Sequence, residues 1–231
     1  MQSDPETLGD IVNAGLFAAT LRAATPLTLA ALGGLFSERA GVVNIGLEGS
    51  MLFGAFFGMW WAAETGSWVL GLAGALVVGA LVGLLHGFFC IQLQADQIVV
   101  GTGINILAPG VTAYLFRAIY GFDGSPNDIS QVPNIELPGA SSIPFIGDIF
   151  GDLNLMVWLT IGLVFASLFV LWKTPIGLRI RSVGEHPRAA ETVGVNVYQV
   201  RYLSVMISGM LAALGGAYLS IGFVGGFNEN M

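Results

Sequence analysis

The sequence predicts an all-α integral membrane protein with about six transmembrane helices, a glycine-rich break between two of them, and one short helix at the membrane surface. Two observations lead to this prediction. Of the 231 residues, 55% are hydrophobic and only 10% are charged, and the mean hydropathy is +0.77. Several apolar runs also approach the roughly 20 residues that a helix needs to cross a bilayer. A soluble domain carries about a quarter charged residues, so a water-soluble fold is excluded.

Six apolar runs stand between the charged residues of the chain. They predict helical spans at 12–36, 46–63, 68–92, 97–119, 153–172 and 202–225. Neither an internal repeat nor a soluble domain is evident, so residues 1–231 are expected to form a single transmembrane domain.

The distribution of basic residues predicts the orientation in the membrane. The 120–152 loop contains five acidic residues and no Lys or Arg, so it is expected to be extracytoplasmic. The 173–201 loop holds five of the eight basic residues and is expected to be cytoplasmic. Counting spans back from it places the N-terminus outside the cytoplasm. Arg117, near the outer end of its span, is the one exception and can snorkel to the interface.

The stretch from Gly33 to Ser50 is richer in glycine and charge than a simple hairpin needs. It places five glycines, two acids and one base between two spans. Polar, glycine-rich backbone at membrane depth is tolerated where it is buried in protein or lines a water-filled path. Residues 37–39 could equally form a solvated cytoplasmic turn. Glu48 lies one helical turn deeper, and with Asn44 it is a candidate for bordering a solute path.

One face of the 97–119 span is polar. Thr102, Asn105 and Thr112 fall on this face, with Pro109 between them. Such side chains either join helices through hydrogen bonds or line a route through the membrane. Both readings stay open, and Thr102 and Asn105 are therefore candidate path residues.

A stripe of small residues on the 68–92 span predicts close helix packing. Ala75, Gly79, Gly83 and Gly87 recur every four residues and share one helix face. His86 stands alone in this span and is expected to be a packing or interfacial residue.

The basic loop contains a segment with helix punctuation at both ends. Proline favours the first position of a helix and glycine the position after its last residue. The segment from Pro187 to Val193, followed by Gly194, therefore predicts a short surface helix with His186 at its cap. A partner protein could bind this helix, or it could be a connector that rests on lipid headgroups.

The sequence contains no motif for ATP hydrolysis, metal binding or catalysis. The chain has no Gly-x-x-x-x-Gly-Lys phosphate loop, so ATP hydrolysis is not assigned to it. The spans show neither a cluster of metal ligands nor a nucleophile paired with a base. No catalytic activity, cofactor or metal is therefore expected. The sparse, loop-confined charges say more about topology than about ligands, and the expected partners include membrane lipid and no nucleic acid.

Three segments together resemble a known family: 35–49, 95–105 and 183–195. They are similar to the permeases of bacterial and archaeal ABC importers in the ribose and branched-chain amino acid group. The wording of the motifs is closest to the nucleoside-type branch, which works with a basic-membrane-protein-like binding lipoprotein. The resemblance covers nearly the whole chain. Members of this family continue with further spans, so the chain looks truncated after Met231; ribose-type relatives also carry an extra N-terminal span.

The resemblance implies a multi-pass permease of the cell membrane. Its expected partners are two ATP-binding cassette ATPase subunits, a second permease subunit and an extracytoplasmic substrate-binding lipoprotein. It also implies import by alternating access of a small polar solute, with a nucleoside favoured over a simple sugar. A secondary transporter driven by an ion gradient is the other alternative, with Glu48 as its one weak candidate residue. The family's coupling helix matches a set of residues in the 173–201 cytoplasmic coupling loop: Pro187, Arg188, Ala189, Ala190, Glu191 and Gly194.

Overall fold

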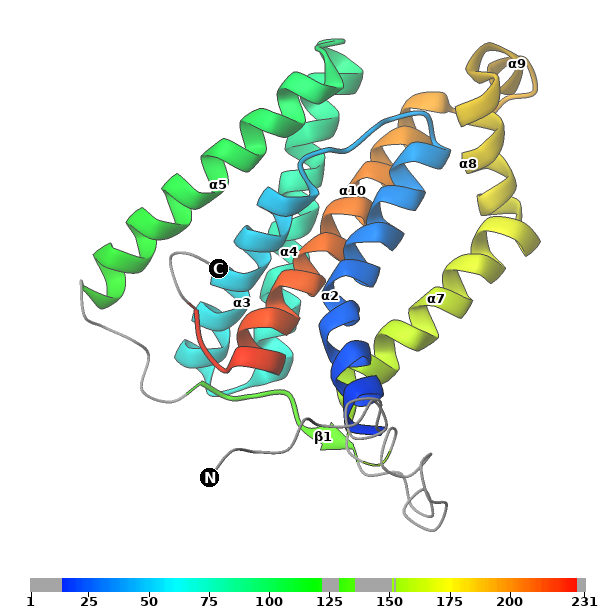
Figure 1. Ribbon diagram of the computed structural model, residues 1–231. Helices are drawn as coiled ribbons and strands as arrows, with labels where there is room; N and C mark the ends of the chain where they lie inside the picture. The colour runs from blue at the N-terminus through cyan, green and yellow to red at the C-terminus, as the bar shows by residue number, and fades with distance from the viewer. Residues whose placement is uncertain (1–13, 122–128, 136–150, 152, 228–231) are drawn as a thin grey trace, which may run out of the picture.

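The computed structural model describes residues 14–121, 129–135, 151 and 153–227. These residues form a bundle of long helices with one short helical hairpin at its upper edge in Figure 1. The long helices are α2 (Ala14–Arg39), α3 (Leu47–Thr65), α4 (Trp68–Gly87), α5 (Gln97–Tyr120), α7 (Leu155–Lys173) and α10 (Val197–Ala217). The hairpin consists of α8 (Pro175–Glu185) and α9 (Pro187–Thr192).

Four minor elements complete the described chain. Helix α4 continues into the π-helical turn η1 (Phe88–Gln92), and α10 continues into η3 (Tyr218–Val224). The strands β1 (Asn134–Ile135) and β2 (Leu153–Asn154) form an antiparallel pair. The fold is thus all-α, as predicted, apart from this two-residue ladder between segments that flank the 136–150 stretch.

Each of the six predicted spans coincides with a helix over most of its described residues; residues 12 and 13 of the first span lie outside the described residues. Within the described residues, five helices are long and apolar enough to cross a membrane: Gly15–Arg39, Trp68–Gln92, Gln97–Tyr120, Leu155–Lys173 and Val197–Val224. Helix α3 is 19 residues long but carries Glu48 and Glu64 near its ends, and it is not among the five. It packs against α4, α5 and α10, so it lies inside the bundle although its composition is less apolar.

The 173–201 segment is more helical than predicted. Helix α8 was not predicted, because its two arginines were taken to indicate a loop. Its start is nevertheless marked locally, since the Thr174 side chain accepts a hydrogen bond from the Gly177 amide and Pro175 opens the helix. Helix α10 begins five residues before the predicted boundary at 202, where the Asn196 side chain accepts a hydrogen bond from the Gln199 amide.

Helix α10 is the central helix of the bundle and packs against α2, α3 and α4. The predicted glycine stripe on α4 faces it. A Cβ on Gly79 would lie 2.5 Å from the Gly209 carbonyl oxygen, and one on Gly83 would lie 2.6 Å from that of Val205. A Cβ on Gly209 would in turn overlap the Gly79 carbonyl oxygen. The stripe therefore brings two helix backbones into direct contact, which confirms the packing interpretation.

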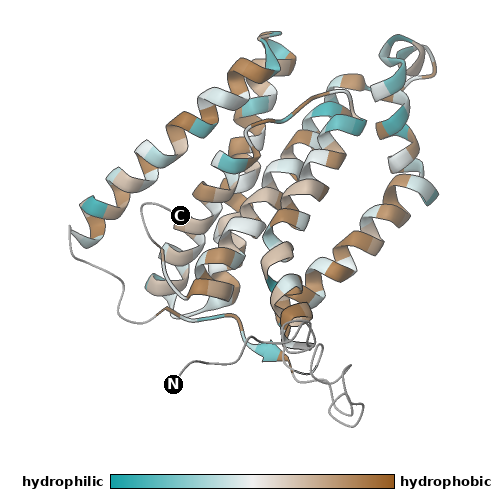
Figure 2. Ribbon diagram, in the orientation of Figure 1, coloured by the Kyte–Doolittle hydropathy of each residue, from teal (hydrophilic) through white to brown (hydrophobic). Residues whose placement is uncertain are grey.

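Helices α5 and α7 lie at opposite flanks of the bundle in Figure 1. Figure 2 shows that hydrophobic residues predominate along α7 and recur along α5. Among the exposed apolar side chains are Ile106 (71%) and Tyr114 (72%) on α5, and Phe165 (68%) and Phe169 (63%) on α7. Such faces fit contact with lipid or with other membrane-embedded protein, because water would not tolerate them over this length.

Candidate functional site

The helices α2 and α3 are separated by a break, which we define as residues 40–46. Helix α2 ends in a tight turn, where the Ala40 and Val42 amides both donate to the Ser37 carbonyl, at 3.1 and 3.0 Å. Gly41 has a φ of +79°, a conformation that favours glycine. Residues 37–39 form the last turn of α2, where Ser37 is completely buried and Glu38 and Arg39 are exposed. The prediction of a solvated segment therefore fits Glu38 and Arg39 but not Ser37.

Residues 42–45 of the break have no regular secondary structure. Side chains from other helices form hydrogen bonds with the backbone polar groups of this segment. The Val43 amide donates to Oε1 of Gln97 on α5 at 2.7 Å. The Val43 carbonyl lies 3.2 Å from Nε2 of His86 on α4. The Ile45 carbonyl accepts a hydrogen bond from Nδ2 of Asn105 at 3.0 Å. Irregular backbone at membrane depth is tolerated where protein groups or a water-filled cavity satisfy its hydrogen bonds, and here protein side chains do so.

Asn44 fastens the break to the central helix. Its side chain is 5% exposed, and Nδ2 donates to Oγ of Ser208 on α10 at 3.0 Å. Its Oδ1 accepts from the Gly46 amide, also at 3.0 Å. Ser208 is completely buried. The predicted path residue Asn44 therefore has a structural role that sequence reasoning did not assign.

Asn105 fastens the same segment from the other side. Its Oδ1 accepts a hydrogen bond from the Gly49 amide in the first turn of α3 at 2.8 Å. The N-cap residue of α3 is Gly46, which has no side chain to accept this bond. Asn105 thus caps α3 from a neighbouring helix. These bonds show that Asn105 joins helices, which is one of the two roles predicted for the polar face of α5. Its second predicted role, bordering a solute path, remains a prediction.

The other members of the predicted polar set lie in different surroundings. Glu48 and Thr102 are exposed, one near the start of α3 and the other on the α5 turn that precedes Asn105. Thr112 is 1% exposed and donates to the Ala108 carbonyl of its own helix at 2.8 Å. The structure therefore brings Asn44 and Asn105 to the same break, leaves Glu48 and Thr102 at an exposed surface, and separates Thr112 from them.

Sequence reasoning missed three of the side chains that hold the break: His86, Gln97 and Ser208. His86 is completely buried, which agrees with the packing role expected for it, and Sγ of Cys90 lies 3.4 Å from its Nε2. The four-residue spacing of His86 and Cys90 places them on one helix face and was the only local signal. No pattern along the chain connects Gln97 or Ser208 with residues 43 and 44.

The predicted surface helix is present as α9, and Gly194 follows it with a φ of +83°. His186 occupies the N-cap position without a side-chain capping bond. Ala190 is 3% exposed and packs with Val183 of α8 and Val197 of α10. By contrast Arg188, Ala189 and Glu191 are exposed. The two alanines are therefore not equivalent: Ala190 anchors α9 to its own chain, and Ala189 lies on its free surface.

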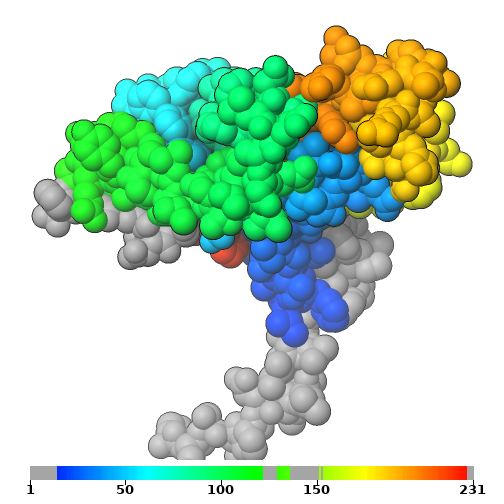
Figure 3. Space-filling view, turned by 90° about the horizontal axis from the view of Figure 1, so that it is seen from above, coloured from blue at the N-terminus to red at the C-terminus, as the bar shows by residue number. Residues whose placement is uncertain are grey.

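Helix α9 packs against α8 and the start of α10, and α8 in turn contacts α2. Figure 3 views this end of the molecule, with α8, α9 and the first turns of α10 in yellow to orange gathered beside α2 in blue. A hollow of about 300 Å³ separates α9 from η1, and Arg188, Glu191 and Arg201 are among its lining residues. Within the described residues, no group of three or more His, Cys, Asp or Glu side chains could hold a metal ion.

The family described as the permease component of the branched-chain amino acid transport system matches residues 16–231. The guanosine ABC transporter permease protein NupQ of Bacillus subtilis is 49% identical over 206 residues, covering 86% of this chain and 64% of that protein. The nucleoside ABC transporter permease protein NupC of Lactococcus lactis is 42% identical over 88% of this chain and 66% of that protein.

A further relative carries a different substrate name. The putative glucose ABC transporter permease protein TsgC13 of Haloferax volcanii is 37% identical over 91% of this chain and 64% of that protein. The chain thus spans about two thirds of the length of the relatives it matches. No solved structure matches it.

Proposed function

Because the chain belongs to the family of branched-chain amino acid transport system permease components, we propose that it is the membrane-spanning permease subunit of an ATP-driven importer. The observation that carries this proposal is the identity of 49% and 42% to permeases named for guanosine and nucleoside transport, over most of this chain. A helical bundle with five span-length apolar helices supports it. ATP hydrolysis then belongs to a separate partner subunit.

The proposed partners are ATP-binding cassette ATPase subunits, a second permease subunit and an extracytoplasmic substrate-binding lipoprotein. The exposed side chains of Arg188, Ala189 and Glu191 make α9 the proposed contact with the ATPase. This places α9 and the basic 173–201 segment on the cytoplasmic side. The N-terminus and the 120–152 segment are then extracytoplasmic.

The proposed transport cycle is alternating access, with the break near the solute path. Asn44 and Asn105 hold its backbone between α5 and α10. Glu48, two residues after the break, and Thr102, on the α5 turn before Asn105, add exposed polar groups. Broken helices are common where transporters bind solutes, because their freed backbone groups and helix ends are available there. A shift of α3 or α5 would change which of these groups a solute meets.

The proposed solute is a nucleoside, on the strength of the two relatives with the highest identities reported above. A simple sugar is the second candidate, favoured by the 37% identity to the putative glucose permease. Uptake of labelled guanosine and labelled glucose by membranes that contain the assembled transporter separates the two. Uptake of glucose with no uptake of guanosine would reject the nucleoside proposal.

The coupling role of α9 is tested by Ala189→Trp in the assembled transporter. A bulky side chain on this exposed position should overfill a contact with the ATPase and lower both ATPase binding and uptake by about tenfold or more. Ala118→Trp is the matched control, because Ala118 is an exposed alanine on another helix, α5. If Ala189→Trp inserts normally and binds the ATPase as well as the control does, α9 is not the coupling helix.

A further inference from the structure

The end of α8 meets the end of α2 through main chain. A Cβ on Gly184, in the last turn of α8, would overlap the carbonyl oxygen of Arg39, the last residue of α2. It would also lie 3.3 Å from the Gly41 amide nitrogen. A Cβ on Gly41 would be 3.4 Å from Cα of Gly184. Both residues belong to the segments that carried the family resemblance. Gly184 cannot be enlarged without moving a helix, whereas Gly41 is restricted by its φ of +79°, which favours glycine.

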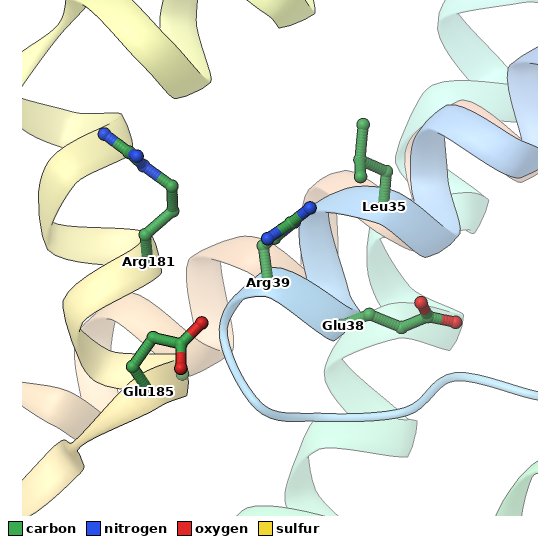
Figure 4. Close-up of a pocket in the computed structure, with 6 residues that line it drawn as sticks. Leu35, Glu38, Arg39, Arg181 and Glu185 are labelled. Atoms are coloured by element: carbon green, nitrogen blue, oxygen red, sulfur yellow. The ribbon is translucent and has the colours of Figure 1, made fainter.

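This contact is narrow. Beside it lies a hollow of about 330 Å³, lined on one side by Leu35, Glu38 and Arg39 and on the other by Arg181, Gly184 and Glu185. Figure 4 shows the labelled side chains on α2 and α8 around the hollow. Next to the hollow, the backbone of Gly184 packs directly against residues 39–41.

Both sides of the contact are rigidly held. On the α8 side, Val183 is completely buried and packs with Ala190 of α9 and Val197 of α10, so α9 cannot shift without its neighbours. On the α2 side, the hydrogen-bonded turn closes over the buried Ser37 and Ala40. A clamp from α10 adds to this, because Nε of Arg201 donates to the Ala40 carbonyl at 3.4 Å.

The turn leads directly into the break. Val42 is 1% exposed and packs against Val205 of α10 and Cys90 of η1. The next residues, Val43 and Asn44, make the hydrogen bonds to α4, α5 and α10 described above. A displacement of α9 therefore has a short, close-packed route to the segment that holds α3, and close-packed interiors transmit displacement with little compression.

We propose that Gly184, Gly41 and Arg201 are positioning residues that transmit the movement of α9 to the break. The proposal rests on the coupling role of α9. It adds that the movement of α9 reaches the transmembrane helices at the contact between Gly184 of α8 and the end of α2. The glycines allow main chain to touch main chain, so no flexible side chain absorbs the movement. The hydrogen bond from Arg201 to the Ala40 carbonyl holds the turn at the end of α2 against α10.

The test compares Gly184→Ala with Gly162→Ala in the assembled transporter. Both glycines lie in helices, so both changes add one methyl group and the same helix propensity, but a Cβ on Gly162 meets nothing within 4 Å. We expect Gly184→Ala to keep ATPase binding and ATP hydrolysis while solute uptake per ATP hydrolysed falls by about tenfold. Gly162→Ala should leave this ratio unchanged. An unchanged ratio in both variants would overturn the proposal.

A second variant covers the case in which Gly184→Ala fails to assemble. Arg201→Met removes the donor to the Ala40 carbonyl without adding bulk, and Arg201→Lys retains a donor. We expect Arg201→Met to lower uptake per ATP and Arg201→Lys to restore most of it, with ATPase binding unchanged in both. Equal uptake per ATP in Arg201→Met and the unmodified protein would reject the proposal. Failure of the coupling role itself has a different signature, namely normal ATPase binding by Ala189→Trp.

Discussion

Replacing Asn105 tests whether its two hydrogen bonds hold the break in place. Asn105→Leu keeps a similar volume but removes the acceptor for the Gly49 amide and the donor to the Ile45 carbonyl. Hydrogen bonds between membrane helices contribute about 0.6 kcal/mol on average and up to about 1.7 kcal/mol each. Two bonds therefore contribute about 1–3 kcal/mol to the free energy of unfolding.

The structure places the expected value in the middle of that range. Ile45 is 40% exposed, so water can replace the bond to its carbonyl. Gly49 is buried against Ile104, and its amide would be left without an acceptor, which costs about 1–3 kcal/mol. We expect Asn105→Leu to lower the free energy of unfolding by about 2 kcal/mol, measured by denaturant titration in mixed micelles.

Thr102→Val is the matched control, because Thr102 lies on the preceding turn of α5 and is exposed. Its effect on stability should stay within about 0.5 kcal/mol. If Asn105→Leu is as stable as this control, the hydrogen bonds to the break contribute nothing and the capping role is wrong. Uptake separates the two roles of Asn105: reduced uptake by an assembled complex with intact ATP hydrolysis indicates a path residue, and loss of assembly indicates helix joining alone.

Three further predictions concern orientation, packing and the path. In a cysteine-free background, single cysteines at Ser182 and at Ser141, which lies outside the described residues, should label from opposite sides of the membrane; labelling of both from outside would contradict the proposed orientation. Gly209→Leu should destabilise the bundle by about 1–3 kcal/mol or more in the same titration, because its side chain meets the α4 backbone, whereas Gly162→Leu should cost little. Glu48→Gln should lower solute uptake without altering assembly, and unchanged uptake would remove Glu48 from the proposed path.

Local patterns were enough to predict most helices of this protein. The spans were found because apolar length is a property of consecutive residues, and α9 was found because Pro187 and Gly194 punctuate it. The same reasoning missed α8, since its arginines outweighed the local signal of Thr174 and Pro175. It also treated Ala189 and Ala190 alike, because a helix of six residues does not reveal which face its neighbours cover.

The sequence by itself determined three things: that the chain is a membrane protein, which residues form its long helices, and that a glycine-rich segment separates α2 from α3. Only the tertiary structure decided what holds that interruption together. Asn44 meets Ser208 across 164 residues of chain, and Asn105 meets Gly49 across 56. The physical reason is that a lipid-embedded backbone must find hydrogen-bond partners inside the protein, and which side chains can supply them depends on how the helices pack.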